Sequence, residues 1–249
     1  MIKLSVLAYF YTLLMTFNAG AQDTPLSMVL SIDSKWEKIA GGLKFCDACC
    51  TDNMGNFYFA DAGTNGPIKK VSHDGKIQDF GPSLDGVSGL QFGGGENLYI
   101  CQGKAQRISV LKNGKDLEVI VKNVRPNDLV VTNNNQLYFT ETSTQRVYHV
   151  NLNDEVKVLR IVDSGILKPN GIGLTSCDGT LMVSDHLEKE VWFFRIDKDN
   201  KLSMKAPYAS LRIRDKKLPS RGDGCDVDSL NRLYAVSYTH LTLPTNREV

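Results

Sequence analysis

Five polar side chains recur at a nearly fixed distance before a repeated, strand-like sequence. Four of them precede a tyrosine by 11 residues, and the fifth precedes a methionine by 12. All but one are Asp or Asn, whose oxygen atoms are the hard ligands that Ca²⁺ prefers, and none offers sulfur or imidazole. If the fold brings them together, their two carboxylates also neutralise a divalent cation. The five residues are Asp47, Ser88, Asn127, Asn170 and Asp223.

The strand-like sequence that follows these positions is rich in Tyr and Phe and returns at intervals of 41, 39, 44 and 52 residues. A turn rich in Gly, Asn or Asp precedes each copy, as suits left-handed or tight-turn backbone angles. A second strand, such as "RISVLK" or "VWFFRI", follows and ends at another turn. The copies are "NFYFAD" from Asn56, "NLYICQ" from Asn97, "QLYFTE" from Gln136, "TLMVSD" from Thr180 and "RLYAVS" from Arg232.

This repeat predicts an all-β fold built from propeller blades. A unit of about 40 to 50 residues with roughly four antiparallel strands is typical of one blade. One blade cannot bury both of its faces alone, so successive blades must pack face to face around an axis. A β-sandwich also spaces its strands regularly, but it gives no reason for the residue identities to repeat.

In a propeller, equivalent positions of successive blades lie on a ring around the axis, so we call the five polar residues the ring residues. If they open the innermost strand of each blade, their side chains converge on one mouth of the central channel. Asn and Asp also cap their own turns, but the turns of this repeat lie about six residues further along the chain. The pattern therefore predicts a divalent metal site, with Ca²⁺ as the preferred ion.

The first 21 residues have the features of a secretory signal. Lys3 precedes an apolar run from Leu4 to Phe17, and the small residues Ala19, Gly20 and Ala21 follow. The run is about 14 residues long, whereas a membrane span needs roughly 20. We expect cleavage after Ala21, export to the periplasm or the extracellular space, and no membrane association of the mature chain.

The other end of the chain reads differently from the repeats. Val236 to Thr245 resembles the forward translation of a transposase adapter used in sequencing libraries. We interpret residues 236–249 as an adapter artefact. Residues 22–235 are then the propeller domain, which we expect to be truncated at its C-terminal end.

The charge distribution excludes one class of partner. Lys and Arg number 29 and Asp and Glu number 28, for a net charge of +1. The basic residues are scattered, so the electrostatic footprint of nucleic-acid binding is missing and no nucleic-acid partner is expected.

Other catalytic constellations fit the sequence poorly. A serine hydrolase would need a suitable histidine and a Gly-x-Ser-x-Gly elbow; the elbow is absent, and His149 lies in a strand, where we expect it to be packed. The run Cys46-x-x-Cys49-Cys50 leaves zinc binding, redox chemistry or a disulfide open in an exported protein. Cys49 and Cys225 each follow a ring residue by two positions, so we expect them to be small core residues of the innermost strand.

Three phrases carry a resemblance to a known family: "RPNDLVV" followed by "LYFTE", "KPNGIGLTSCDGTLMVSD", and "GDGCDVDSLNRLYA". They resemble the senescence-marker-protein, gluconolactonase and luciferin-regenerating-enzyme family of regucalcin-like, six-bladed propellers. The resemblance covers about Phe45 to Ala235. It implies a six-bladed β-propeller that is incomplete here, with about four blades and the start of a fifth.

The resemblance also implies a set of site residues. Members bind one divalent metal, commonly Ca²⁺, through three residues that correspond to Asp47, Asn170 and Asp223, and Zn²⁺ and Mn²⁺ are alternatives. Asn127 lies beside the metal and the substrate in relatives, and Arg125 takes the place of an arginine that helps to hold the substrate. The chain departs from the family in the first blade, because Asp47-Ala48-Cys49 replaces the usual Glu-Gly-Pro. The shorter carboxylate makes direct ligation by Asp47 less secure.

The implied activity is metal-dependent hydrolysis of a sugar lactone or related ester, as in gluconolactonase. Such a metal polarises the carbonyl group, and Asp223 is expected to serve as a ligand and as the base that assists the attacking water. Two other classes stay open: a propeller that binds a ligand without turnover, and an interaction scaffold. Calcium binding distinguishes the scaffold from the other two classes, and lactone turnover distinguishes those two from each other.

Overall fold

This computed structural model describes residues 29–31, 33, 35, 37–211 and 220–237. The predicted signal, residues 1–21, and residues 238–249 of the predicted adapter segment lie outside the described residues. Residues from Lys38 onward form one compact unit, and every strand below belongs to it. In the described part of the chain, no helix is long and apolar enough to cross a membrane.

Four four-stranded antiparallel sheets and one two-stranded sheet follow one another along the described chain. The first sheet consists of β1 (Cys46–Thr51), β2 (Phe57–Asp61), β3 (Ile68–Val71) and β4 (Ile77–Phe80). The second consists of β5 (Val87–Phe92), β6 (Leu98–Gln102), β7 (Arg107–Lys112) and β8 (Asp116–Lys122), with one turn of 3-10 helix, η2 (Gly94–Glu96), between β5 and β6.

The remaining sheets repeat this order of neighbouring hairpins. The third sheet consists of β9 (Leu129–Val131), β10 (Gln136–Glu141), β11 (Arg146–Asn151) and β12 (Arg160–Asp163). The fourth consists of β13 (Pro169–Leu174), β14 (Thr180–Asp185), β15 (Glu190–Ile196) and β16 (Leu202–Ser210). The fifth pairs β17 (Gly222–Val227) with β18 (Leu233–Ser237), so Val236 and Ser237 of the predicted adapter segment end a strand.

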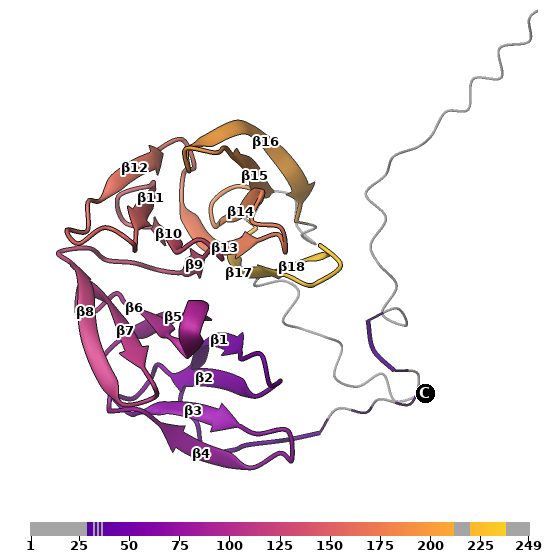
Figure 1. The fold of residues 1–249 in the computed structure, drawn as a ribbon. Coiled ribbons are helices and arrows are strands. Elements are labelled where there is room, and N and C mark those ends of the chain that lie inside the picture. The colour runs from indigo at the N-terminus through magenta and orange to yellow at the C-terminus, as the bar shows by residue number, and fades with distance from the viewer. Residues whose placement is uncertain (1–28, 32, 34, 36, 212–219, 238–249) are drawn as a thin grey trace, which may run out of the picture. The chain divides into compact units, whose positions relative to one another are not determined.

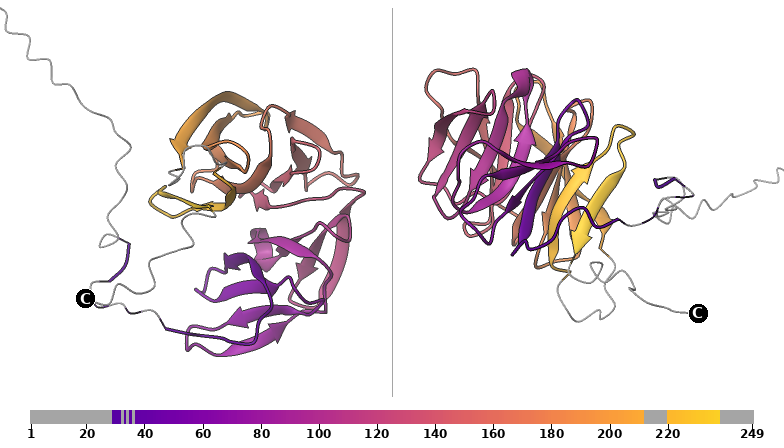
Figure 2. Two further views of the ribbon diagram at one scale, coloured as in Figure 1. Left: turned by 180° about the vertical axis from the view of Figure 1, so that it is seen from behind. Right: turned by 90° about the horizontal axis from the view of Figure 1, so that it is seen from below.

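The sheets follow one another around a common centre, with their first strands nearest to it (Figures 1 and 2). Each first strand packs against the first strand of the next sheet, from β1 through β5, β9 and β13 to β17. The five repeated sequences form the second strands β2, β6, β10, β14 and β18. The predicted all-β fold and its propeller-like arrangement are therefore confirmed.

The turns between the first and second strands have the predicted backbone chemistry. Asn135, Asp178 and Asn231 adopt φ values of 60°, 58° and 59°, and Gly55 and Gly95 occupy the same left-handed region in the first two sheets. Asn, Asp and Gly reach this region at the least steric cost. The recurrence of these residue types before each strand therefore has a local cause.

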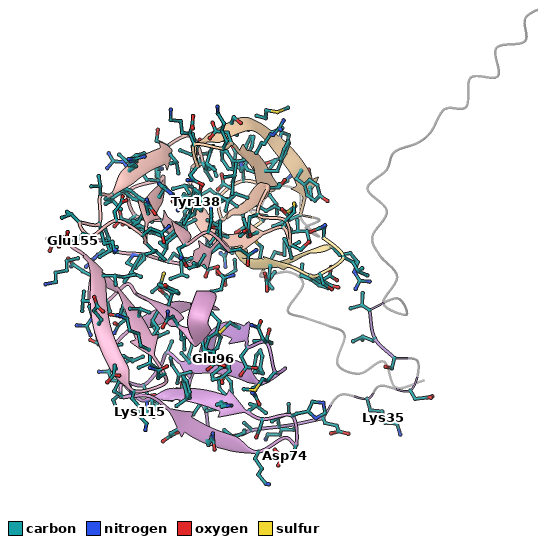
Figure 3. All side chains as sticks on the ribbon, in the orientation of Figure 1. Lys35, Asp74, Glu96, Lys115, Tyr138 and Glu155 are labelled. Carbon is teal, nitrogen blue, oxygen red and sulfur yellow. The ribbon has the colours of Figure 1, made fainter. Side chains whose placement is uncertain are left out.

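The apolar core lies between neighbouring sheets. Three clusters of buried side chains join successive pairs of the first four sheets, and the second strands β6 and β10 are buried along their whole length. The ring of Tyr58 on β2 meets that of Phe92 on β5 edge-on, with centroids 4.8 Å apart. Figure 3 shows Tyr138 inside, whereas Asp74, Lys115 and Glu155 lie at the periphery. Full burial of one such large apolar side chain stabilises the fold by about 1.5–3 kcal/mol.

The cysteines depart from the sequence-based expectation at one position. All six are free thiols, so none of the disulfides considered above is present. Cys225 is buried as expected, but Cys49 is exposed, and the expectation that it is a core residue is wrong. Cys225 faces the neighbouring fourth sheet, where its Sγ lies 3.9 Å from the Met182 carbonyl oxygen. The strands that pack closely against β1 are β2 and β5. Neither of them covers the side chain of Cys49, which stays exposed to solvent.

His149 on β11 is packed, as predicted, with 3% of its surface exposed. Its Nε2 lies 2.9 Å from Gln136 Oε1, and its ring centroid lies 4.9 Å from that of Tyr138. Desolvation lowers the pKa of His149, the positive charge of Arg160 lowers it further, and Asp154 acts in the opposite direction. Folding therefore favours the neutral form of this imidazole over the charged form.

We expect the contribution of His149 to the free energy of unfolding to decrease as the pH falls from 7 to 5. The unfolded chain binds a proton on His149 at the ordinary pKa of about 6.5, and the folded chain resists that proton, so acid favours unfolding. The loss should reach at most about 1.4 kcal/mol per pH unit. Denaturant unfolding at a series of pH values measures it.

The variant His149→Gln should remove this part of the pH dependence. The control His73→Gln changes a histidine in an exposed turn and should leave the acid sensitivity intact. Equal slopes for the wild type and both variants would show that His149 does not cause the effect.

Candidate functional site

Four ring residues lie second in the first strand of their sheet, and Asn127 lies two residues before β9; the chain bulges at each of these positions. The pairing register shifts between residues 47 and 49, 87 and 89, 169 and 172, and 222 and 225. In the third sheet, Asn127 N donates to Thr140 O at 2.8 Å and Thr140 N donates to Asp128 O at 3.0 Å, so two residues face one there also. A bulge therefore recurs at all five ring positions. A bulge bends its strand and changes the direction of a side chain.

A polar side chain at the end of four of the second strands holds the chain that leads into a ring residue. Glu141 Oε1 accepts a hydrogen bond from Arg125 N at 2.5 Å. Asp185 accepts from Leu167 N at 3.1 Å and Lys168 N at 3.2 Å. Asp61 accepts from Phe45 N at 2.9 Å, and Gln102 Nε2 donates to Asp85 O at 3.3 Å.

These supporting residues were missed by sequence reasoning, although the signal was present. They are the last letters of four of the repeated phrases, Asp61, Gln102, Glu141 and Asp185. A polar residue that recurs at the end of an otherwise apolar, buried strand requires a partner. The partner here is the loop that leads into the ring residue of the same sheet.

A chain of hydrogen bonds ties the ring from one sheet to the next. Ser88 Oγ donates to the Pro126 carbonyl oxygen at 3.1 Å and Thr140 Oγ1 donates to that of Asn170 at 2.5 Å. Ser184 Oγ donates to the Asp223 carbonyl oxygen at 2.6 Å. The backbone positions of four ring regions are therefore coupled through three hydroxyl groups.

Three ring side chains keep their polar atoms available. Within the residues that the structure describes, the side chains of Asn127, Asn170 and Asp223 make no hydrogen bond, although Asn170 is 9% exposed. Among the described residues, the fully buried side-chain atoms without a partner do not include those of Asn170, so solvent reaches this amide. An amide and a carboxylate left free at the start of neighbouring strands are suited to bind a ligand or an ion.

The two ring carboxylates interact with each other. Desolvation raises the pKa of Asp47, and the negative charge of Asp223 raises it further, while the hydrogen bond from Ala48 N, at 2.8 Å, opposes the rise. Like charges brought together in this way favour a neutralising cation. The ring is therefore electrostatically unsatisfied on the side of the first and fifth sheets.

The donor set fits a hard divalent cation. Across the described ranges, no three His, Cys, Asp or Glu side chains gather as a metal site, so a cation here would need amide oxygen as well as carboxylate. Asp47, Asn170 and Asp223 offer that combination, and Ca²⁺ accepts both kinds of ligand. The exposed Cys49 has its pKa raised by desolvation and by the charges of Asp128 and Asp226, which disfavours the thiolate that a soft metal would require.

Asp128 is a further acidic residue that the sequence reasoning did not select. Its Oδ1 accepts from Leu129 N at 2.9 Å, and its Oδ2 accepts from Ile172 N of the fourth sheet at 3.1 Å. Desolvation raises the pKa of Asp128 to about 7, with smaller contributions from the charges of Asp226 and Asp47. Asp128 thus links two sheets directly beside the ring.

The two predicted substrate residues, Arg125 and Asn127, line one cleft. This cleft has a volume of ≈370 Å³, and its lining consists of Gly103, Lys104, Arg125, Pro126, Asn127, Thr142 and Ser143. Asn127 belongs to both the ring and the cleft, so the two adjoin. A larger hollow of ≈580 Å³, beside Phe59 and Lys69 of the first sheet, contains none of the predicted site residues.

The comparison with known proteins agrees with this architecture. The family described as SMP-30/Gluconolactonase/LRE-like region matches residues 84–243, which is more than half of the chain. The chain belongs to this family. The predicted family resemblance is therefore confirmed.

Individual relatives of the family are distant. A gluconolactonase from Zymomonas mobilis is 21% identical over 246 residues, which cover 84% of this chain and 69% of the relative. The solved structure of a gluconolactonase from Xanthomonas campestris has a TM-score of 0.65 at 18% identity and covers 78% of this chain and 70% of its own. A luciferin-regenerating enzyme has a TM-score of 0.61 at 16% identity and covers 80% and 71%. These structures share the fold with this family member.

The fit between the fourth and fifth sheets gives a test of how the family fold positions Asp223. A Cβ atom on Gly171 would lie 2.4 Å from both Asp223 O and Cys225 N, whereas one on Gly224 would meet nothing within 4 Å. We expect Gly171→Ala to destabilise the protein by about 1–3 kcal/mol because backbone atoms of β17 must move. Thermal or denaturant unfolding measures the change.

The matched control is Gly224→Ala, one residue from Asp223 on the strand that Gly171 faces. It should change the unfolding free energy by no more than about 0.5 kcal/mol. Equal destabilisation by the two substitutions would mean that the close approach of β13 and β17 does not limit the site.

Proposed function

We propose that the protein is a metal-dependent hydrolase of sugar lactones or related esters, with Ca²⁺ as the natural ion. Its family membership supports a lactonase-type activity. The observation that carries the proposal is the ring itself, where Asp47, Asn170 and Asp223 bring oxygen atoms from separate sheets to the start of the innermost strands. When bound there, the ion would supply a Lewis acid for the lactone carbonyl group.

Each chain residue has a defined task in this proposal. Arg125 and Asn127 hold the hydroxyl groups of the sugar in the cleft beside the ring. Asp223 orients a water molecule and accepts its proton as the water oxygen bonds to the carbonyl carbon. The ester C–O bond of the lactone then breaks, the leaving oxygen takes up the proton from Asp223, and the product is the open-chain hydroxy acid.

The site is built to hold these groups in place before a substrate arrives. The main chain around the ring is fixed by Glu141, Asp185 and the three inter-sheet hydroxyl bonds, so ordering it costs little upon binding. The free side chains of Asn127, Asn170 and Asp223 are thereby carried on a rigid frame. This is the arrangement that electrostatic catalysis requires.

The activity test measures hydrolysis of aldonolactones by the full chain. The release of acid is recorded in the presence of Ca²⁺, Zn²⁺, Mn²⁺ or a chelator. We expect turnover with Ca²⁺ and its loss with the chelator. Asp223→Asn should lower kcat on the order of 10²-fold or more by removing the base. Asn170→Ala should weaken calcium binding measured by titration calorimetry.

Asp74→Asn serves as the control, because Asp74 lies in a peripheral turn (Figure 3). A folded protein that binds no divalent ion, or that retains ion and activity after both Asn170 and Asp223 are changed to Ala, would rule out the proposal. Calcium and ligand binding without turnover would instead indicate a binding propeller, and the absence of both would indicate a scaffold.

We further propose the six-bladed form of the propeller and export through the signal in residues 1–21. N-terminal sequencing of protein secreted by an expressing host should begin at Gln22. Retention of residues 1–21 on the isolated protein would contradict the export proposal.

A further inference from the structure

We propose that the cleft lined by Lys104, Arg125 and Ser143 binds an anionic group of the substrate. The substrate would then be a lactone of a sugar acid that carries a carboxylate or phosphate in addition to the lactone itself. This inference rests on the proposed function and specifies its substrate class.

The first argument is the state of the two cations. Arg125 is exposed, and in the described part of the chain its side chain makes no ion pair or hydrogen bond. Lys104 Nζ lies 2.9 Å from Asp85 Oδ1, but the two side chains are 67% and 40% exposed. A pair this exposed is weak and can exchange partners. The cleft therefore presents one unpaired guanidinium and one loosely paired ammonium group.

The second argument is the supply of neutral donors. The amide of Asn127 and the hydroxyl of Ser143 also have no partner within the described residues, and both line the cleft. Thr142 is different, because its Oγ1 donates to the Pro169 carbonyl oxygen at 2.7 Å. A guanidinium with adjacent amide and hydroxyl donors matches the several acceptor oxygens of a carboxylate or phosphate.

The third argument is that one buried carboxylate holds both walls of the cleft. Glu141 is 6% exposed. Its carboxylate accepts a hydrogen bond from Arg125 N on one wall of the cleft. On the other wall it accepts a hydrogen bond of 2.5 Å from Thr144 Oγ1, next to Ser143. Tyr148 donates to the same carboxylate at 3.2 Å. A Cβ on Gly103 would lie 2.9 Å from Pro126 O, so the glycine lets the second and third sheets close beneath the cleft. The main chain that carries Arg125 and Ser143 is thus fixed, while their side chains stay free to contact a ligand.

The fourth argument is that the exposed cations and the ring carboxylates lie at different parts of the site. Asp47 and Asp223 lie on the first and fifth sheets, whereas Lys104 and Arg125 line the cleft, where the nearest carboxylates, Asp85 and Glu141, already bind Lys104 Nζ and Arg125 N. Asn127 joins the two regions. A substrate with an anionic end would be oriented with that end over Arg125 and its carbonyl group toward the ring. A volume of ≈370 Å³ suits a small molecule rather than a macromolecule.

The experiment compares three lactones with the same sugar ring: a neutral aldonolactone, its 6-carboxylate analogue and its 6-phosphate ester. We expect kcat/KM to be at least about tenfold higher for one of the anionic lactones, the increase that a charge-assisted hydrogen bond can provide. The two anionic arms distinguish carboxylate from phosphate. The preference should shrink as the salt concentration rises.

Two variants locate the preference in the cleft. Arg125→Met and Lys104→Met should each reduce the preference for the anionic lactone several-fold more than they reduce turnover of the neutral one. Lys115→Met removes a peripheral lysine (Figure 3) and should leave the preference unchanged. Equal kcat/KM for neutral and anionic lactones, or an unchanged preference in both cleft variants, would overturn the inference.

A binding measurement keeps this inference separate from the proposed hydrolysis. Calorimetric titration with methyl glucoside, methyl glucuronide and methyl glucoside 6-phosphate, with and without CaCl₂, requires no turnover and places the anionic group at position 6. We expect at least one anion to bind about tenfold more tightly than methyl glucoside, and Arg125→Met to remove the difference. If the anion binds in this way but no lactone is hydrolysed, the subsite stands and the hydrolase proposal fails. If Arg125→Met has no effect on anion binding, the subsite proposal fails.

Discussion

The close approach of the first strands at the centre is the constraint on which the site depends. The Gly171 position allows β13 to lie against the backbone of Asp223 and Cys225, and Gly89 similarly allows β5 to lie against Asn127 and Asp128. At these separations a Cβ atom has no room, so the glycines of β13 and β5 and the position of the ring backbone depend on each other. The apolar clusters between the sheets supply the driving force that brings the strands to this distance.

Satisfied polar groups surround the unsatisfied ones. Glu141, Asp185 and the hydroxyl groups of Thr140 and Ser184 all have partners, and their hydrogen bonds fix the main chain near the ring. Within the described residues, the side chains of Asn127, Asn170 and Asp223 make no hydrogen bonds that support the fold. This division explains how a buried polar region can be stable and still bind a ligand.

Much of the fold and part of the site could be predicted from particular residues. The repeated Tyr-rich phrases predicted β2, β6, β10, β14 and β18, because short runs of apolar and aromatic residues and the turn chemistry before them act locally. The 11-residue spacing placed the ring residues at the start of first strands. Glu141, Asp128 and the cleft were missed, because their roles depend on partners in other segments and other sheets. The expected burial of Cys49 was wrong for the same reason, since its spacing matched that of Cys225 but its neighbours did not.

By itself, the sequence determined the strands, their turns and the identity of the oxygen-bearing residues that open each blade, since these depend on local periodicity and backbone preference. Only the tertiary structure decided which polar atoms have no hydrogen-bond partner and that the charge of Asp223 raises the pKa of Asp47. It also decided that Arg125, Lys104 and Ser143 line one cleft. The physical reason is that hydrogen-bond saturation, desolvation and Coulomb interaction depend on distances between atoms of different sheets. Those distances exist only after the sheets have packed around their centre.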